Sequence, residues 1–449
     1  MLYAILKVLM RITIRVFFRK VHIRNLDQVP RTGPLLVCAN HPSAFMDPIM
    51  VAALLGRPVH FLAKAAIFKT KFAQWMLPKL NIIPIYRKQD DPAQMHKNQE
   101  TFEKCFEHLG KGGAILIFPE GISITERKLR ELKTGAARIA LGAAKKYDYK
   151  LDVHIVTVGL NYNNPHRFRD EVFINAEKAL SVSAFFEQHK TDEFAAAQEL
   201  TDEIRKRLET HIISIEDAHN DELVARIEKL YKQRLMRERG ISKEETEKSF
   251  ELTRRIAETV RYFSEKDPER VARISKDIDR YLRDVDRTGL SDRQLDTSRR
   301  RGSRVVKNGA ELAFIIFGFP FFLFGTICNG IPYWLVKGFV SAKVKQREFQ
   351  GSIAMAGGMF LYLTWYTLIA VFSWKYIFHH WLALVFTANL IPAGIWAFYY
   401  YTVLKHIRRR WFFASLFHKR TALVADFIVQ RENLIKEFEI AAEEFRKTE

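Results

Sequence analysis

The sequence predicts an α/β domain followed by a charged helical region and C-terminal transmembrane helices. Two observations carry this prediction. Between about residues 21 and 213, short apolar runs alternate with stretches of helical periodicity, which is typical of an α/β domain. Beyond residue 308, three long segments contain no Lys, Arg, Asp or Glu, which is typical of helices that cross a bilayer.

The 449-residue chain divides on this basis into five parts. We expect an amphipathic interfacial helix over 1–20, the α/β domain over 21–213, a charged helical region over 214–308, a membrane domain over 309–405 and a C-terminal helix over 406–449. Lys and Arg exceed Asp and Glu by 71 to 51, which gives a net charge of +20. This excess predicts an anionic partner, and the apolar segments favour a lipid bilayer over nucleic acid.

The first twenty residues place Lys7, Arg11, Arg15 and Arg19 at four-residue spacing. On a helix these cations form one stripe, opposite a face of Leu, Ile and Val side chains. The pattern predicts a helix lying at the surface of an anionic bilayer. The alternative is an amphipathic helix packed on the α/β domain.

The apolar runs predict strands over 34–39, 58–63, 81–86, 114–118, 153–160 and 171–175. Helices are expected to begin near Pro48 and at Gly135. No Gly-x-Gly-x-x-Gly or Walker sequence is present, so no nucleotide cofactor is expected. The three cysteines have no metal-ligand spacing, and we interpret them as small apolar residues.

Residues 214–308 are dense in charges of both signs. Leu223, Ile227 and Leu230 recur at helical spacing, and Asp267-Pro268 is typical of a helix start. We expect a helical hairpin or small bundle that joins the α/β domain to the membrane. The chain after about residue 417 is expected to form a long amphipathic helix packed back on this bundle.

The three uncharged segments are Leu312–Val336, Phe349–Trp374 and Trp381–Leu404, each long enough to cross a hydrocarbon core of about 30 Å. Basic clusters flank them at Arg299–Arg301 with Arg304, at Lys343, Lys345 and Arg347, and at Arg408–Arg410. Three simple crossings would leave one basic cluster on the outer side. We therefore expect Pro320 and Pro332 to break the first segment into a re-entrant pair of half-helices, with a third span as the alternative.

A candidate catalytic pair follows the apolar run 35–39. His41 leaves the strand end, and Asp47 follows a turn or so later. An imidazole can take a proton from a hydroxyl near neutral pH, while a carboxylate holds the ring in the right tautomer and stabilises the imidazolium. The pair indicates general-base catalysis by His41 with Asp47 as its orienting partner. The alternative is a strand-to-helix turn in which His41 is only a satisfied polar residue.

A second motif, Phe118-Pro119-Glu120-Gly121, directly follows the apolar run 114–117. Together with His41 and Asp47 it resembles the PlsC-like glycerophospholipid acyltransferases, which carry a His-x4-Asp motif and a Phe-Pro-Glu-Gly motif. Five residues separate His41 from Asp47 here, a spacing similar to that of the fungal-type glycerol-3-phosphate/dihydroxyacetone-phosphate acyltransferases. The resemblance covers roughly residues 30–215 and implies a mixed sheet flanked by helices.

The resemblance implies an integral membrane O-acyltransferase of phospholipid biosynthesis. Such an enzyme would transfer a fatty acyl group from acyl-CoA or acyl carrier protein to the sn-1 hydroxyl of glycerol 3-phosphate, by direct attack and with no further cofactor. We expect the catalytic domain on the cytoplasmic face, in a bacterial inner membrane. Two alternatives stay open: a 1-acylglycerol-3-phosphate acyltransferase that makes phosphatidate, and a non-catalytic membrane scaffold on an acyltransferase fold.

The same resemblance assigns substrate-binding residues. Arg87, at the end of the run 82–86, matches the family Arg that binds the substrate phosphate, although Asn81 stands where the family has Gly. Glu120, followed by Gly121, matches the residue that orients the glycerol or that Arg. The alternatives are a surface cap at a strand end for Arg87 and a turn carboxylate bonded to backbone amides for Glu120.

Ser123 stands where many relatives have Arg. The phosphate charge is therefore expected to be met by Arg127, Lys128 or Lys133, with a solvated surface as the alternative for the first two. No Gly-x-Ser-x-Gly surrounds Ser43, so we interpret it as a local cap. We expect His166 to contact substrate or solvent, because no carboxylate stands at a matching offset.

Overall fold

The computed structural model describes residues 2–87, 92–215, 217–242, 245–296, 304–376, 379–419 and 421–448. The chain divides into two compact units: Met1–Ser214 with Val340–Gly357, and Ile215–Phe339 with Gly358–Glu449. The first unit therefore includes residues 340–357, which lie inside the stretch that we expected to form the membrane domain. Arg299–Arg301, the basic cluster before the first apolar segment, lie outside the described residues.

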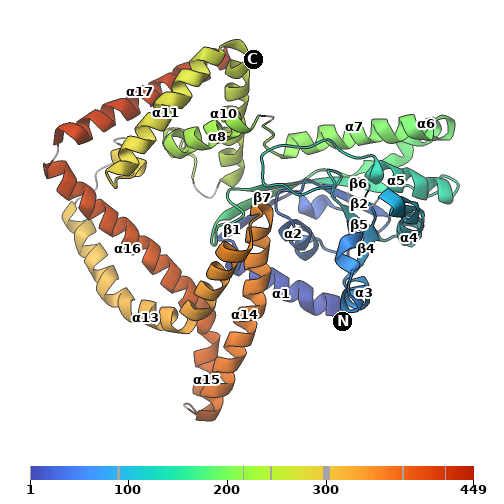
Figure 1. Cartoon of the computed structure of the whole chain (residues 1–449), viewed down its shortest axis with the longest axis horizontal. Coiled ribbons are helices and arrows are strands. Elements are labelled where there is room, and N and C mark those ends of the chain that lie inside the picture. The colour runs from blue at the N-terminus through green and yellow to red at the C-terminus, as the bar shows by residue number, and fades with distance from the viewer. Residues whose placement is uncertain are drawn as a thin grey trace. The chain divides into compact units, whose positions relative to one another are not determined.

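The first unit contains the sheet and the helices that cover it (Figure 1). Its strands are β1 Lys20–Arg24, β2 Leu35–Ala39, β3 His60–Lys64, β4 Ile82–Ile85, β5 Ala114–Ile117, β6 His154–Tyr162, β7 Glu171–Ala176 and β8 Leu180–Ser181. Its helices are α1 Leu2–Phe17, α2 Met46–Leu54, α3 Lys71–Met76, α4 Asn98–Gly110, α5 Gly135–Lys146, α6 Phe186–Thr191 and α7 Glu193–His211. Each of the six predicted strands is present, whereas the short strands β1 and β8 were not predicted.

Among the described residues the strands form one eight-stranded sheet in the order β1-β7-β6-β2-β5-β3-β4, with β8 paired to β6. Strand β2 lies in the middle and pairs parallel with both β5 and β6. Strands β3 and β4 continue the parallel arrangement, and β7 is antiparallel to β6. The predicted α/β domain with a mixed sheet is confirmed.

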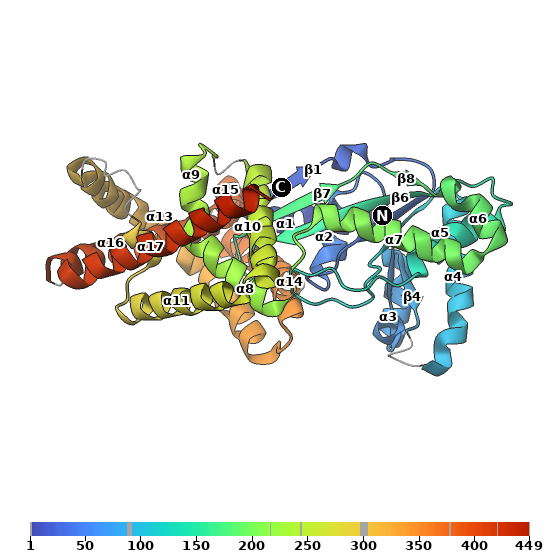
Figure 2. The same cartoon turned by 90° about the horizontal axis from the view of Figure 1, so that it is seen from above.

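The two faces of the sheet have separate cores, because side chains alternate along each strand. On β2, Leu35 and Val37 pack toward α1 and α2, whereas Leu36 and Cys38 pack toward α4, α5 and α7. Figures 1 and 2 show α1 and α2 on one side of the sheet and α7 on the other. Burial on both faces explains why the central strands are continuous apolar runs in the sequence.

The N-terminal helix α1 packs on α2 through part of its basic stripe. The Lys7 amine donates to the carbonyl of Leu55 at 2.7 Å, and Arg11 Nε donates to the carbonyl of Ala53 at 2.6 Å. These carbonyls lie at the C-terminal end of α2, where helix carbonyls lack partners and the dipole favours cations. Ile5 and Val8 are exposed on the other face of α1. Contact between α1 and a bilayer stays a prediction.

The second unit is helical. Its helices before the apolar segments are α8 Ala218–Ile227, α9 Gln233–Glu238, α10 Thr246–Lys266, α11 Pro268–Arg287 and α12 Asp292–Leu295, and its last helix is α17 Thr421–Arg446. Helix α11 begins at the predicted Asp267-Pro268 start, where the Asp267 side chain accepts from the Arg270 amide. Helix α17 packs against α10, α11 and α12.

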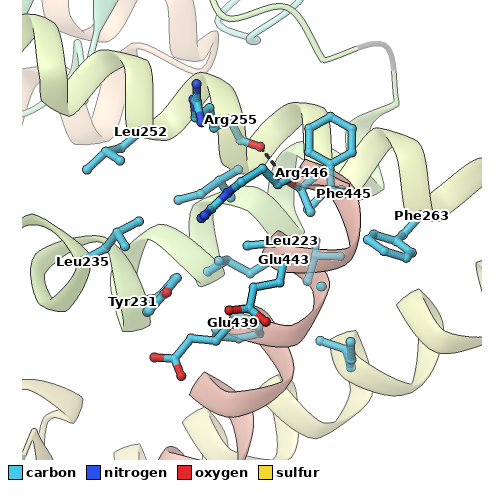
Figure 3. Close-up of a pocket in the computed structure, with 18 of the residues that line it drawn as sticks. Leu223, Tyr231, Leu235, Leu252, Arg255, Phe263, Glu439, Glu443, Phe445 and Arg446 are labelled. Carbon is cyan, nitrogen blue, oxygen red and sulfur yellow. Dashed lines mark hydrogen bonds between the residues drawn. The ribbon is translucent and has the colours of Figure 1, made fainter. Parts of the chain in front are cut away.

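A cavity of about 310 Å³ lies among α8, α10, α11 and α17 in this unit (Figure 3). Its lining is mainly Leu, Ile, Val and Phe, with Arg and Glu side chains among them. None of the residues assigned to the candidate site lines it. The cavity is therefore separate from the predicted chemistry.

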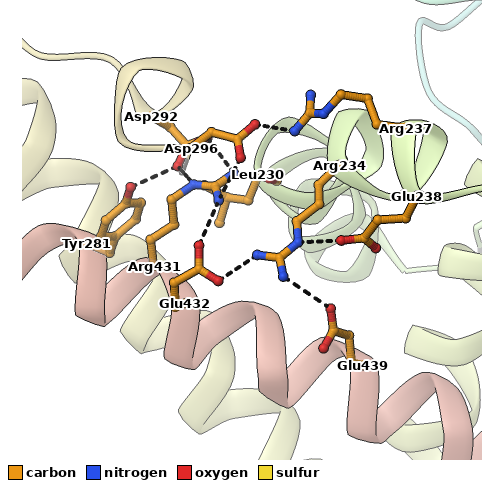
Figure 4. Close-up of polar contacts among 10 residues, drawn as sticks. All are labelled: Leu230, Arg234, Arg237, Glu238, Tyr281, Asp292, Asp296, Arg431, Glu432 and Glu439. Atoms are coloured by element: carbon orange, nitrogen blue, oxygen red, sulfur yellow. Dashed lines mark hydrogen bonds and ion pairs between the residues drawn. The ribbon is translucent and has the colours of Figure 1, made fainter. Parts of the chain in front are cut away.

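The same unit contains a buried ion cluster (Figure 4). Arg431 Nε lies 2.8 Å from Asp292 Oδ1, and the Arg431 side chain is 2% exposed. The same carboxylate oxygen accepts from the Tyr281 hydroxyl at 2.8 Å, and Arg431 also donates to the carbonyl of Leu230. The cluster thus joins α17 to α11, α12 and the turn after α8.

The apolar segments form α13 Arg304–Lys343, α14 Arg347–Tyr376, α15 His380–Ala388 and α16 Leu390–Lys419. Three stretches of the described residues are long and apolar enough to cross a membrane: Gly309–Lys343, Arg347–Tyr376 and His380–Arg409. Helix α13 runs unbroken through Pro320 and Pro332, so the predicted break into two half-helices is wrong. A proline removes one backbone hydrogen bond and bends a helix, and α13 accommodates both prolines as a curved helix (Figure 1).

Candidate active site

The candidate site lies where several parallel strands end together. Strands β2, β4, β5 and β6 run in the same direction, so their carboxyl ends meet at one edge of the sheet. His41 follows β2, Arg87 follows β4, Glu120 follows β5 and Tyr162 ends β6. This topology brings together residues that are far apart in the sequence.

His41 and Asp47 form the pair that the sequence predicts. His41 Nδ1 lies 2.8 Å from Asp47 Oδ2, and the His41 side chain is 18% exposed whereas that of Asp47 is fully buried. The Ser43 amide donates to the same carboxylate oxygen at 2.7 Å. The Tyr162 hydroxyl donates to Asp47 Oδ1 at 2.8 Å. With Nδ1 held by Asp47, Nε2 is the imidazole nitrogen that can exchange a proton with a substrate.

Residues that follow strand β5 hydrogen-bond to the turn that carries His41. Glu120 Oε1 accepts from the His41 amide at 2.9 Å, and Oε2 accepts from the Arg130 amide at 3.3 Å. Ser123 Oγ accepts from the amide of Ala44, whose φ is +36°. A positive φ is strained for a residue with a side chain, and such strain persists only where surrounding contacts hold it. Glu120 and Ser123 are therefore placed to fix the His41 backbone.

Two further contacts orient this turn. The Asn40 side chain exchanges two hydrogen bonds with the backbone of Leu160 on β6, at 2.7 and 3.0 Å. The Phe118 ring stacks on the His41 imidazole with ring centroids 4.0 Å apart. The imidazole is thus positioned by Asp47 at one nitrogen and by Phe118 at one face.

Arg87 and Lys133 converge on Gly121. Arg87 Nη1 donates to the Gly121 carbonyl at 2.6 Å. Gly121 has φ +72°, and a Cβ built on it would lie 2.9 Å from Lys133 Nζ, so the lysine amine lies directly against this glycine. A side chain there would be strained and would displace the amine. Two cationic groups therefore lie next to the Phe-Pro-Glu-Gly turn, and phosphate binding by them stays a prediction.

The other assigned residues are less closely tied to the site. Arg127 and Lys128 are half-buried on the loop between Gly121 and α5, and their part in phosphate binding stays a prediction. Asn81, which replaces the expected Gly, has φ +62°. Asn tolerates this left-handed conformation, so the turn before β4 is kept. His166 lies against the start of α14, and its pKa is lowered by burial and by the charge of Arg347.

Burial raises the pKa of two acid groups around His41, the Glu120 carboxyl and the Tyr162 hydroxyl. The pKa of Glu120 is raised because its carboxyl is desolvated, an effect that the hydrogen bonds from the His41 and Arg130 amides oppose. The pKa of Tyr162 is raised well above 10.0, first by burial and then by the charge of Asp47 and the hydrogen bond to it. Tyr162 therefore keeps its proton and acts as a hydrogen-bond donor.

Sequence reasoning missed the roles of Tyr162 and Asn40. Both are polar residues next to apolar strands that pair in parallel, β6 and β2. The alternation of side chains along β6 could have indicated the position of Tyr162, because residues 158, 160 and 162 share one face of the strand. Among the described residues, no group of three or more His, Cys, Asp or Glu side chains is arranged to hold a metal ion.

Comparison with known proteins gives two family matches. The family described as Acyltransferase matches residues 20–161, which include His41, Asp47, Arg87 and Glu120. The family described as Glycerol-3-phosphate acyltransferase 2 C-terminal domain matches residues 230–426. The two matches follow one another along the chain, so both compact units contribute to them.

Curated relatives share parts of this sequence. Glycerol-3-phosphate O-acyltransferase 1 of Saccharomyces cerevisiae is 33% identical over 135 residues, covering 29% of this chain and 18% of the relative. Glycerol-3-phosphate O-acyltransferase 2 of the same yeast is 24% identical over 289 residues, covering 62% of this chain and 37% of the relative. A chloroplastic 1-acyl-sn-glycerol-3-phosphate acyltransferase of Arabidopsis thaliana is 30% identical over 124 residues, covering 27% and 33%.

The matches thus span between about a fifth and two fifths of the lengths of these three relatives. The motifs, the mixed sheet and the family matches agree on the identity of the domains. Residues 20–161 are similar to PlsC-like acyltransferase domains, and residues 230–426 match the family described as Glycerol-3-phosphate acyltransferase 2 C-terminal domain.

Proposed function

We propose that this protein transfers a fatty acyl group from a thioester donor, acyl-CoA or acyl carrier protein, to the sn-1 hydroxyl of glycerol 3-phosphate. The observation that carries the proposal is the His41–Asp47 pair, with 2.8 Å between Nδ1 and Oδ2 and a partly exposed imidazole. This geometry suits a general base whose tautomer is fixed by a buried carboxylate.

In the proposed reaction, His41 Nε2 takes the proton of the acceptor hydroxyl as its oxygen bonds to the thioester carbonyl carbon. The carbon–sulfur bond then breaks, and the imidazolium returns the proton to the thiolate that leaves. Asp47 stabilises the imidazolium between these steps. Ser43 is fully buried, which favours direct transfer over a covalent acyl–serine intermediate.

The phosphate of the acceptor would bind at Gly121. Arg87 and Lys133 supply cationic donors there, and Arg127 and Lys128 on the adjoining loop would add to the positive field. The N-terminus of α5 at Gly135 adds unpaired backbone amides, which favour an anion. Glu120 would act by holding the backbone of His41 and not by contacting the glycerol.

The three apolar helices and the net charge of +20 favour an anionic bilayer as the site of action. We place the acyltransferase unit on the cytoplasmic face of a bacterial inner membrane, where a soluble thioester donor meets a membrane-retained product. The reaction as proposed needs no cofactor beyond the acyl donor, and it involves no nucleic acid.

A second acceptor is 1-acylglycerol 3-phosphate, with phosphatidate as the product. The match to the plant 1-acyl-sn-glycerol-3-phosphate acyltransferase favours this alternative, whereas the two yeast glycerol-3-phosphate O-acyltransferases favour glycerol 3-phosphate. The yeast similarity extends over more of this chain, so glycerol 3-phosphate is the acceptor that we propose.

The test is acyl transfer by the purified full chain in phospholipid nanodiscs. Labelled acyl-CoA or acyl carrier protein is offered with glycerol 3-phosphate, dihydroxyacetone phosphate or 1-acylglycerol 3-phosphate in parallel. Higher kcat/KM for glycerol 3-phosphate supports the proposal. Preference for the lysolipid would keep the chemistry and reassign the acceptor. Folded protein that transfers to none of the three with either donor would favour a non-catalytic scaffold.

A further inference from the structure

The start of α14 is built into the acyltransferase unit. Residues 340–357 cluster with residues 1–214, and Met355 is 1% exposed within the core that also contains Met46, Met50 and Leu160. Ser352 is fully buried in the same stretch. The candidate membrane span Arg347–Tyr376 includes the first part of this stretch of α14 and continues to the end of the helix. One helix therefore begins as part of the catalytic core and continues as a candidate membrane span.

Gly351 lies in close contact with the core. A Cβ built on Gly351 would overlap the carbonyl oxygen of Pro165 and would lie 3.3 Å from Cε of Met46. Real Cβ atoms essentially never approach other heavy atoms within 3.0 Å. The nearer neighbour is backbone, which cannot rotate away as a flexible side chain does. Only glycine lets α14 lie this close to the loop 163–170.

The two residues that Gly351 contacts belong to the segments that position Asp47. Met46 is the residue before Asp47 in the first turn of α2. Pro165 lies three residues after Tyr162, whose hydroxyl donates to Asp47. The Phe349 ring also lies 5.5 Å from that of Phe45, at the start of α2. Helix α14 therefore contacts both sides of the Asp47 hydrogen-bond group.

We infer that Gly351 is a positioning residue through which α14 holds the Asp47–Tyr162 group, and with it His41, in the reactive geometry. This inference rests on the proposed function, in which His41 is the base. A side chain at position 351 would push the loop 163–170 or Met46 away from α14. The contacts of Asp47 with His41 and Tyr162 would then loosen, while the contacts of Arg87 and Lys133 at Gly121 lie on other segments and stay unchanged.

The experiment compares Gly351→Ala and Gly351→Val with Gly357→Ala and Gly357→Val in the full chain in nanodiscs. Gly357 lies on the same helix, and a Cβ there would meet nothing within 4 Å, so the control pair has the same helix propensities without the contact. A displacement of about 1 Å in an active site costs about 100-fold in rate. We expect kcat to fall about 10- to 100-fold in Gly351→Val, and less in Gly351→Ala, with KM for both substrates within about threefold of the wild-type value.

A second readout does not depend on turnover. Diethylpyrocarbonate modifies accessible imidazole nitrogens, and mass spectrometry of the His41 peptide gives its rate. We expect faster modification of His41 in both Gly351 variants than in either Gly357 variant, because the ring is held less firmly by Asp47. If Gly351→Val does not fold, Gly351→Ala carries both comparisons.

The inference is overturned if the Gly351 and Gly357 variants have equal kcat and equal His41 modification rates. It is also overturned if the Gly351 variants change KM alone. A wild-type chain that transfers no acyl group would refute the proposed function, and the modification rates of His41 would still decide the positioning role.

Discussion

Two buried carboxylates in this protein have nearly the same surroundings. Asp47 and Asp292 each lie in the first turn of a helix, α2 and α12. Each accepts a hydrogen bond from a tyrosine hydroxyl at 2.8 Å, from Tyr162 and Tyr281 respectively. Each also lies 2.8 Å from a side-chain nitrogen, His41 Nδ1 or Arg431 Nε. The polar geometry alone therefore does not separate them.

Asp47 and Asp292 differ in the kind of side chain that provides the neighbouring nitrogen atom. His41 is an imidazole with 18% of its side chain exposed, and imidazoles serve as general bases in catalysis. Arg431 is 2% exposed, and a guanidinium keeps its charge at every physiological pH. The first arrangement can transfer a proton to a substrate, whereas the second can only hold helices together (Figure 4). Partner chemistry and exposure, more than burial, distinguish a catalytic carboxylate from a structural one.

The largest expected effect is on turnover in Asp47→Asn. The amide keeps the size of the side chain, but it neither fixes the imidazole tautomer nor stabilises the imidazolium. We expect kcat to fall about 10³- to 10⁴-fold. We also expect the free energy of unfolding to fall by about 1–3 kcal/mol, because the buried amide NH2 would face groups that donate to Asp47. Initial rates of acyl transfer and chemical unfolding in mixed micelles measure the two quantities. Retention of more than a tenth of the wild-type kcat would remove Asp47 from the proposed mechanism.

Asp292→Asn is expected to lower stability and to leave turnover unchanged. The substitution leaves the buried Arg431 charge without its nearest counter-ion, which costs about 3 kcal/mol in the free energy of unfolding. The loss is at the lower end for such pairs because Asp296 lies 3.6 Å from Arg431 Nη1. Below the unfolding temperature, kcat should stay within about twofold of the wild-type value because the residue is not part of the reacting group.

The matched control is the double variant Asp292→Leu/Arg431→Met, which removes both charges. It should lose less stability than Asp292→Asn, because no unpaired charge stays buried. A double variant that is as unstable as Asp292→Asn would show that packing, and not the uncompensated charge, dominates this cluster.

Substitutions of the two tyrosines test the same difference between Asp47 and Asp292, with smaller expected effects. Tyr162→Phe removes a donor to Asp47 and is expected to lower kcat about tenfold, equivalent to about 1.4 kcal/mol. Tyr281→Phe removes the corresponding donor to Asp292 and is expected to lower the free energy of unfolding by about 1–3 kcal/mol with kcat unchanged. Rates and unfolding curves are measured for both variants. An exchange of the two phenotypes would contradict the assignment of the two carboxylates.

The smallest expected effect is the pH dependence that Glu120 contributes to stability. Burial raises its pKa above the ordinary 4.5, so on raising the pH the unfolded chain releases this proton before the folded chain does. The contribution of Glu120 to the free energy of unfolding therefore falls as the pH rises from about 4.5 through the raised pKa of the folded state. Below and above this pH range the contribution is constant. Glu120→Gln should remove this fall. Unfolding curves between pH 4 and 8 test it, and identical pH slopes for the two proteins would contradict it.

Local sequence patterns predicted the parts of the site that depend on single strand ends. The runs before His41 and Glu120 are strands β2 and β5, and the Arg87 guanidinium lies at Gly121. Phosphate binding by Arg87 stays a prediction. The Tyr162–Asp47 contact was not predictable in the same way, because it joins residues 115 positions apart through the pairing of β6 with β2.

The structural carboxylate was still less accessible to sequence reasoning. Asp292 and Arg431 are separated by 139 positions and belong to no motif. Most of α14 was assigned to the membrane domain because residues 349–374 contain no Lys, Arg, Asp or Glu, yet Gly351 and Met355 lie in the core of the acyltransferase unit. An apolar run has the same composition whether lipid or protein covers it. The continuity of α13 was missed because proline penalties are local, whereas tertiary packing decides whether a helix continues.

General-base catalysis by His41 is best tested by acyl transfer to glycerol 3-phosphate with the wild type and His41→Gln, with unfolding curves for both. We expect turnover by the wild type, a loss of at least about 10³-fold in the variant and the same unfolding midpoint. His41→Gln with kcat within tenfold of the wild-type value would show that the imidazole beside Asp47 is not the base.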